Sequence, residues 1–193
     1  MNVQCFGMLK NIYDNMPSKD NAWIAGGALR SFLVADKVKD IDIFSYDVQK
    51  TLSDFRSDTS FELRNENEFI ANFYKNNLCY QVIKKYSFSG PQETIDNFDF
   101  TIVCAGLGKD GVVTDPRFYI DNAQKRLVVK SLPKPLSTMK RALKYTSRGY
   151  LLCPVSLAKI LKAIQERPIN WENPSENEIE FYPDGTPSFR GLD

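Results

Sequence analysis

The sequence predicts an α+β fold built on a small mixed or antiparallel sheet. Segments with the apolar runs or the alternation typical of strands lie between residues 21 and 129, helical spacing dominates from Pro135 onward, and no internal repeat is present. The chain has 193 residues, 42% of them hydrophobic and 25% charged, which suits one domain with a small appendage. A chain of this length buries about 70% of its unfolded surface, so it needs no disulfide or structural metal to fold.

The first half of the chain is predicted to alternate helices with short strands. Residues 3–16 carry apolar side chains at helical spacing, whereas the apolar run 21–25, closed by two glycines, predicts a buried strand. Strict alternation over 39–44 predicts a strand with one face on the core. The other expected elements are helices over 28–34 and 47–55, a helical turn over 91–97, and an antiparallel meander of strands over 59–64, 68–75 and 78–86.

The second half is predicted to add short strands and then become helical. The apolar run 98–104 predicts a strand, followed by a turn over 106–111. Short strands over 112–114 and 126–129, a helix or turn over 116–123, and two helices over 135–150 and 155–164 complete the list. We therefore expect a head domain over residues 1–134 and, over 135–193, a basic helical extension with an acidic, irregular tail.

The composition excludes several classes of chemistry. The chain contains no histidine, which excludes Ser-His-Asp and Cys-His nucleophile systems, His-ligated zinc and histidine acid–base catalysis. Its four cysteines are scattered without a CxxC pair, which predicts reduced thiols inside the cell. The apolar runs are too short to cross a bilayer and the N-terminus lacks the pattern of a secretory signal, so we expect a cytoplasmic protein without a membrane partner.

Charge is segregated along the chain, although the net charge is only +1. Residues 122–165 contain ten Lys and Arg residues and no Asp or Glu, whereas the segment that follows is acidic. A basic region of this size indicates a polyanion partner, such as an RNA acceptor or the triphosphate of a nucleotide. The alternatives are a solvated helical surface and a dock for the acidic tail.

Three features within residues 24–44 carry the predicted chemistry. Gly26 and Gly27, between a strand and a helix, allow backbone amides to approach a phosphate, and Arg30 follows on the first helical turn. Asp40 and Asp42 are two residues apart in a strand, so both carboxylates leave the same face. Adjacent carboxylates repel unless a cation lies between them, and with Mg²⁺ they form an oxygen-ligand site beside substrate phosphates. A plain turn and a solvated strand face are the alternatives, but chance rarely gives all three features at this spacing.

A third carboxylate is expected at Asp99. The apolar residues of 98–102 share one face of the predicted strand, which leaves Asp99 on the other face, beside the Asp pair if the strands are neighbours. A carboxylate on an otherwise apolar strand is costly without a partner. Asp96 is the alternative third ligand, and a solvated or structural role for Asp99 is equally open.

The stretches 24–30 (Ile-Ala-Gly-Gly-Ala-Leu-Arg) and 39–44 (Lys-Asp-Ile-Asp-Ile-Phe) resemble the nucleotidyltransferase motif of the CCA-adding enzyme and bacterial poly(A) polymerase family. Weaker similarities follow in the same order at 97–102, at 114–116 with Asp121, and at 141–148. The chain departs from the family at Ser31, where Asp is usual, and before Arg141, where the acids of the base-templating Glu-Asp-x-x-Arg element are missing. The resemblance therefore implies a head domain and nucleotidyl transfer, not CCA addition.

The resemblance implies the nucleotidyltransferase (DNA polymerase beta-like) fold and a specific reaction. A nucleoside monophosphate would pass from an NTP such as ATP to a hydroxyl of an RNA end, a protein or a small molecule, with release of pyrophosphate. Two Mg²⁺ ions about 4 Å apart, or Mn²⁺ in their place, would be held by Asp40 and Asp42 with Asp99 as third ligand. The residues expected to bind the nucleotide are Gly26, Gly27, Arg30, Lys39, Arg141, Lys144 and Arg148.

Two rival functions and one group of side chains stay open at this point. A non-catalytic relative that binds RNA or protein is the main rival, and hydrolysis of a phosphate ester by water at the same carboxylates is the second. Among the aromatic residues, Tyr145 is the first candidate for stacking on a base, because basic residues surround it in the sequence. Tyr74, Tyr80, Phe88 and Tyr119 are further candidates, although most aromatic residues are expected in the core.

Overall fold

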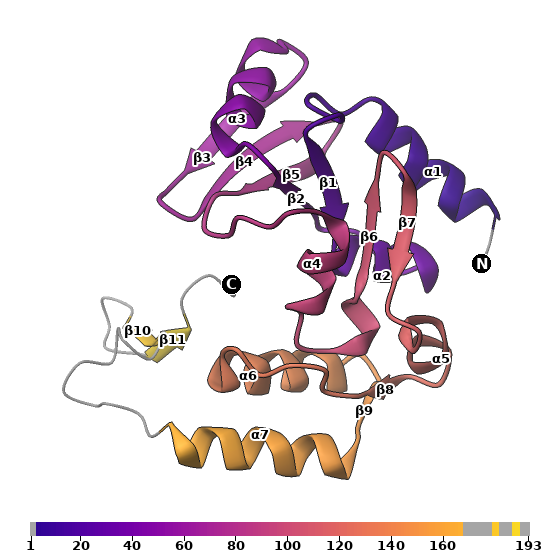
Figure 1. Ribbon diagram of the computed structural model, residues 1–193, viewed down its shortest axis with the longest axis vertical. Helices are drawn as coiled ribbons and strands as arrows, with labels where there is room; N and C mark the ends of the chain where they lie inside the picture. The colour runs from indigo at the N-terminus through magenta and orange to yellow at the C-terminus, as the bar shows by residue number, and fades with distance from the viewer. Residues whose placement is uncertain (1–2, 168–178, 182–186, 190–193) are drawn as a thin grey trace.

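The computed structural model describes residues 3–167, 179–181 and 187–189, and it confirms the expected α+β architecture with a mixed sheet (Figure 1). The main sheet has seven strands in the order β3-β4-β5-β2-β1-β6-β7, and only β2 and β5 pair in parallel. These strands are β1 (Ala22–Ala25), β2 (Asp40–Ser45), β3 (Glu62–Glu66), β4 (Ile70–Lys75), β5 (Leu78–Ile83), β6 (Ala105–Gly108) and β7 (Gly111–Thr114). Short pairs join β8 (Arg126–Leu127) to β9 (Leu151–Leu152) in parallel, and β10 (Ile179–Phe181) to β11 (Pro187–Phe189) in antiparallel.

Helices cover the two faces of the sheet unequally. The helices are α1 (Val3–Asp14), α2 (Gly27–Leu33), α3 (Val48–Ser57), α4 (Pro91–Asp96), α5 (Phe118–Ala123), α6 (Pro135–Thr146) and α7 (Pro154–Glu166). On one face, α1, α2 and α3 bury apolar side chains of the strands, among them Ile41, Ile43 and Phe73. On the other face, α4 packs against β1, β6 and β7, where Thr94 accepts a hydrogen bond from the Trp23 indole at 2.9 Å. The part of that face over β2, β5 and β4 carries polar side chains such as Asp42 and Gln81, but it is apolar at the C-terminal ends of β2 and β5, where Phe44 and Ile83 pack with Phe88 and Phe98.

A second core lies beneath the sheet. Figure 1 shows α6 and α7 running side by side there. Phe100, Ile102 and Leu127 pack against Tyr145 of α6 and Ile160 of α7. This core joins residues from both sides of the boundary expected at 134/135, and that division of the chain stays a prediction. Within the described ranges, every helix is too short or too polar to span a bilayer.

The prediction of a strand over residues 98–104 is wrong. Phe100 makes only an isolated bridge with Val129, residues Thr101–Val103 form a 3₁₀ helix (η1), and the strand β6 begins at Ala105. The reason lies in distant partners, because the apolar side chains enter the second core and Thr101 donates a hydrogen bond to the buried Asp121 at 2.7 Å. The expected turn over 106–111 is accordingly shorter, since β6 and β7 pair on either side of residues 109–110.

Candidate functional site

The predicted carboxylate pair is present on β2. Asp40 and Asp42 alternate with Ile41 and Ile43, which are fully buried under the helices, so both carboxylates lie on the opposite face of the sheet. Asp40 is exposed and Asp42 is half-buried. Burial and then the charge of Asp40 raise the pKa of Asp42 to about 7, while the nearby ammonium of Lys144 opposes this shift. Two such carboxylates fit a hard cation, because a cation between them would remove their repulsion.

The glycine turn lies next to this pair. Gly26 has φ +91°, a conformation that side chains rarely adopt, and a Cβ on it would lie 3.6 Å from Oδ2 of Asp42. The same Cβ would lie 3.5 Å from the ring of Phe98, so the backbone at the end of β1 passes close to the carboxylate. Gly27, which begins α2, has open space around its Cβ position. The turn therefore brings backbone next to Asp42, and its expected role in binding a phosphate stays a prediction.

Arg30 lies elsewhere than expected. Its side chain is 2% exposed, and its Nη2 donates to Asp36 at 3.0 Å and to Ser31 at 2.9 Å. Its guanidinium also lies 5.4 Å from the ring centroid of Tyr145 and 5.9 Å from that of Tyr150. Arg30 therefore fills the seam between α2 and α6 and is enclosed by protein groups where the sequence had suggested phosphate oxygens.

Lys144 lies near the Asp pair, and two other predicted basic residues, Lys39 and Arg148, lie near Lys144. Lys144 of α6 interacts electrostatically with Arg148, Asp40 and Lys39. Partial desolvation lowers the pKa of Lys144, the neighbouring cations lower it further, and Asp40 opposes them. Arg148 also lies 3.8 Å from a carboxylate oxygen of Asp36. Lys144 thus places positive charge beside the two carboxylates, an arrangement that suits a metal-bound triphosphate.

Asp99 and Arg141 pair with each other. Asp99 is 5% exposed, and its Oδ2 accepts a hydrogen bond from Nε of Arg141 at 2.5 Å. Asp96, the alternative third ligand, instead binds Lys130 at 2.8 Å. In the described part of the chain, no group of three or more His, Cys, Asp or Glu residues could hold a metal ion. The expected triad is not assembled, because residues 98–104 leave the sheet and turn Asp99 toward α6.

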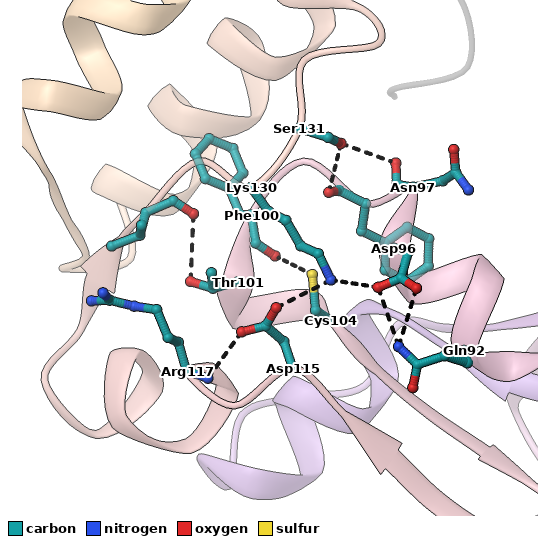
Figure 2. A network of polar contacts seen from close by, with 12 residues as sticks. Gln92, Asp96, Asn97, Phe100, Thr101, Cys104, Asp115, Arg117, Lys130 and Ser131 are labelled. Atoms are coloured by element: carbon teal, nitrogen blue, oxygen red, sulfur yellow. Dashed lines mark hydrogen bonds and ion pairs between the residues drawn. The ribbon is translucent and has the colours of Figure 1, made fainter.

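Lys130 belongs to a polar network that the sequence did not reveal (Figure 2). Its ammonium bridges Asp96 at 2.8 Å and Asp115 at 3.1 Å, and Asp115 also accepts a hydrogen bond from the backbone N–H of Arg117. The network ties the end of α4 to the loop before α5. Lys130 and Arg141 therefore have structural partners, and only part of the basic segment 122–165 is available to a polyanion. Tyr145 is also in the core, at 7% exposure, and not on a surface where it could stack on a base.

The raised pKa of Asp42 predicts how stability depends on pH. Because the folded protein holds this proton up to about pH 7 and the unfolded chain releases it near pH 4, stability falls as the pH rises between these values. We expect Asp42→Asn to be more stable than the parent at pH 8 by more than about 1 kcal/mol without divalent ions, and to lose this advantage at pH 4. Thermal unfolding at both pH values, with and without Mg²⁺, measures it. Mg²⁺ should stabilise only the parent, and equal stability of the two proteins at pH 8 would contradict the raised pKa of Asp42.

Comparisons with known proteins give one family match and several structural neighbours. A family model described as Gabija anti-defense 2 family protein matches residues 2–125. Gabija anti-defense 2 of Bacillus phage SPbetaL7 is 26% identical over 163 residues, which are 79% of this chain and 39% of that protein. The Thermotoga maritima CCA-adding enzyme complexed with tRNA is similar in structure, with a TM-score of 0.63, 15% identity, and coverage of 86% of this chain and 43% of that one.

A second solved structure is similar to a comparable degree. A tRNA nucleotidyltransferase complexed with a primer tRNA and an incoming ATP analog has a TM-score of 0.59 and 19% identity, and the match covers 78% of this chain and 49% of that one. These likenesses show that the fold is that of a nucleotidyltransferase head domain, as the motif over residues 24–44 implied. The chain spans about two fifths of the length of the phage protein and less than half of each enzyme.

Proposed function

The chain belongs to the Gabija anti-defense 2 family, and from this membership and the site on β2 we propose that it counters Gabija defense as a metal-dependent nucleotidyltransferase. It would move a nucleoside monophosphate from an NTP to a hydroxyl acceptor and release pyrophosphate. The observation that carries the proposal is the Asp40–Asp42 pair. Its electrostatics favour a cation, and it lies beside the glycine turn on a nucleotidyltransferase fold.

Different residues of the site would bind the metal and the triphosphate in such a transfer. Asp40 and Asp42 would hold Mg²⁺, or Mn²⁺ in its place, and the metal would supply activation of the hydroxyl and neutralisation of phosphate charge. Lys39, Lys144 and Arg148 would bind the triphosphate and stabilise the departing pyrophosphate. With Asp99 paired to Arg141, the protein offers two carboxylates to the metal, and the substrate phosphates would complete its coordination.

A single screen tests the reaction. The protein is incubated with each of four NTPs labelled at the α-phosphate, with Mg²⁺ or Mn²⁺, and with total RNA and protein as acceptors. We expect the label to enter one acceptor class with release of an equal amount of pyrophosphate. Release of phosphate without incorporation of label would instead indicate hydrolysis. If neither incorporation nor release is seen, the proposed enzymatic activity is contradicted.

A non-catalytic role is the second candidate, because the Asp99–Arg141 pair removes the expected third carboxylate from the site. In that case the fold would act by binding RNA or a protein. Gabija-defended bacteria infected with phage distinguish the two functions. We expect phage growth to be rescued by the parent protein but not by Asp42→Asn, and full rescue by the variant at equal expression would favour the binding role.

A further inference from the structure

Beside the Asp pair, the same face of the sheet carries polar side chains on β5 and β4, next to the apolar cluster that contains Phe44 and Ile83. Two rows of paired side chains run across β2, β5 and β4. The first row is Asp40–Cys79–Tyr74, and the second is Asp42–Gln81–Asn72. The alternate residues of these strands point to the other face, where Phe73 and Val82 are fully buried. Tyr74, Gln81 and Asn72 are half-buried, and the main contacts of α4 with the sheet are with β1, β6 and β7. The carboxylate site therefore opens on one flank toward these polar side chains.

A bulge in β3 places a cation on this surface. The pairing of β3 with β4 shifts register between Leu63 and Asn65, so Arg64 is the extra residue, and a bulge of this kind re-aims a side chain. The guanidinium of Arg64 lies 4.4 Å from the ring centroid of Tyr74 and 2.8 Å from a carboxylate oxygen of Glu62. A guanidinium held against an aromatic ring is a planar group on which a nucleobase stacks with little preference for its identity.

An amide pair lies beside this platform, in the row of side chains that begins at Asp42. Gln81 donates a hydrogen bond from Nε2 to Oδ1 of Asn72 at 3.0 Å, and both residues belong to the row that begins at Asp42. Side-chain amides form hydrogen bonds with the edges of bases. The surface thus combines stacking and hydrogen-bonding groups within two strands of the catalytic carboxylates.

The direction of the reaction assigns this surface to the acceptor. In phosphoryl transfer the attacking and leaving oxygens lie roughly in line, on opposite sides of the phosphorus. Of the cations that would receive pyrophosphate, Lys144 lies on α6 and Arg148 directly follows it, and α6 is held by the Arg30–Tyr145 contact to α2, the helix after β1. Because β2 lies between β1 and β5, the attacking hydroxyl then enters from the side of β5 and β4.

We propose that this polar face binds the terminal nucleobase of a single-stranded nucleic-acid acceptor. Arg64 and Tyr74 stack on the base, and Gln81 and Asn72 hydrogen-bond to its edge, while the hydroxyl of the same nucleotide reaches the Asp pair. Strands are spaced by about 4.8 Å, so Tyr74 lies about 10 Å across the sheet from Asp40, a distance that one nucleotide can bridge. The inference rests on the proposed function, because it assigns the acceptor side of that reaction.

Two matched RNAs test the inference. Both are 12-nucleotide single strands with a 3′-hydroxyl, and one lacks the base of its last nucleotide. By fluorescence anisotropy we expect the parent protein to bind the complete RNA about tenfold more tightly than the abasic one. Tyr74→Leu should bind both RNAs with the weaker affinity, whereas Tyr74→Phe, which keeps the ring, should retain the discrimination.

Further variants keep the outcome decisive. Arg64→Ala changes an exposed residue on an edge strand and should reduce the discrimination even if Tyr74→Leu does not fold. Equal affinity of the parent for the two RNAs, or full discrimination in Tyr74→Leu and Arg64→Ala, would overturn the inference. Calorimetric binding of each NTP with Mg²⁺ tests the proposed function separately, and there we expect Tyr74→Leu to match the parent. A parent that binds no NTP contradicts the proposed reaction, while the RNA comparison alone decides the nucleobase site.

Discussion

Asp42→Asn should abolish nucleotidyl transfer while leaving the fold intact. The variant removes one of the two charged oxygen ligands and halves the charge that holds the cation, at a position where burial already favours the neutral side chain. If the metal supplies several kcal/mol of transition-state stabilisation, the loss is at least about 10²-fold. Asp40→Asn should behave in the same way. Initial rates of label transfer, measured on the acceptor class found in the NTP screen, give the effect.

The control for this prediction is a variant that also loses one negative charge, but at a position away from β2. Asp110→Asn, in the exposed turn between β6 and β7, should keep full activity. Circular dichroism and thermal unfolding should show that all three variants are folded. Full transfer by either Asp40→Asn or Asp42→Asn would exclude the metal-dependent mechanism, whatever the RNA-binding results.

Arg30→Ala should cost about 3 kcal/mol of folding free energy. The variant empties a site that is 2% exposed and removes the contacts of the guanidinium with Tyr145, Tyr150 and Asp36. For a chain of this length the loss corresponds to a fall in melting temperature of roughly 6–12 °C. Denaturant titration and thermal unfolding measure it directly.

Arg30→Met separates this structural role from phosphate binding. Met fills much of the same volume without a charge, and apolar replacements of buried ions are often tolerated, so we expect less than half of the stability loss. If Arg30 only joins α2 to α6, this folded variant binds each NTP with Mg²⁺ as the parent does. An NTP affinity at least tenfold weaker in Arg30→Met, with stability preserved, would indicate that Arg30 binds phosphate. It would contradict a role confined to the seam between α2 and α6.

The part of the fold that the sequence predicted well is the part governed by local rules. A strand ending in two glycines, a short helix and a strict alternation with two Asp residues gave β1, α2 and β2 with bounds close to those observed. The antiparallel meander of β3, β4 and β5 followed from β-branched and aromatic runs between Asn-rich turns. These choices depend on side chains within a few residues, so the pattern alone contains the information.

The errors arise where partners are distant in sequence. The alternation over 98–102 predicts a strand. Contacts with Asp121, Val129 and Arg141, which are distant in sequence, hold the segment outside the main sheet. Arg30 had the spacing of a phosphate ligand, and only the aromatic rings of α6 and its C-terminal loop reveal its burial. A β-bulge at Arg64 likewise leaves no local signal, because it depends on the register of two paired strands.

The second core has a consequence for how the protein unfolds. Phe100, Ile102 and Leu127 precede the boundary expected at 134/135, yet their burial depends on Tyr145 and Ile160 beyond it. A polypeptide ending at residue 134 would expose these three side chains to water, at a cost of roughly 1.5–3 kcal/mol for each large apolar group. The nucleotidyltransferase sheet and the paired helices below it are therefore expected to form one cooperative unit. Amides of η1 and of α6 should then exchange with solvent through the same opening event, despite their separation along the chain.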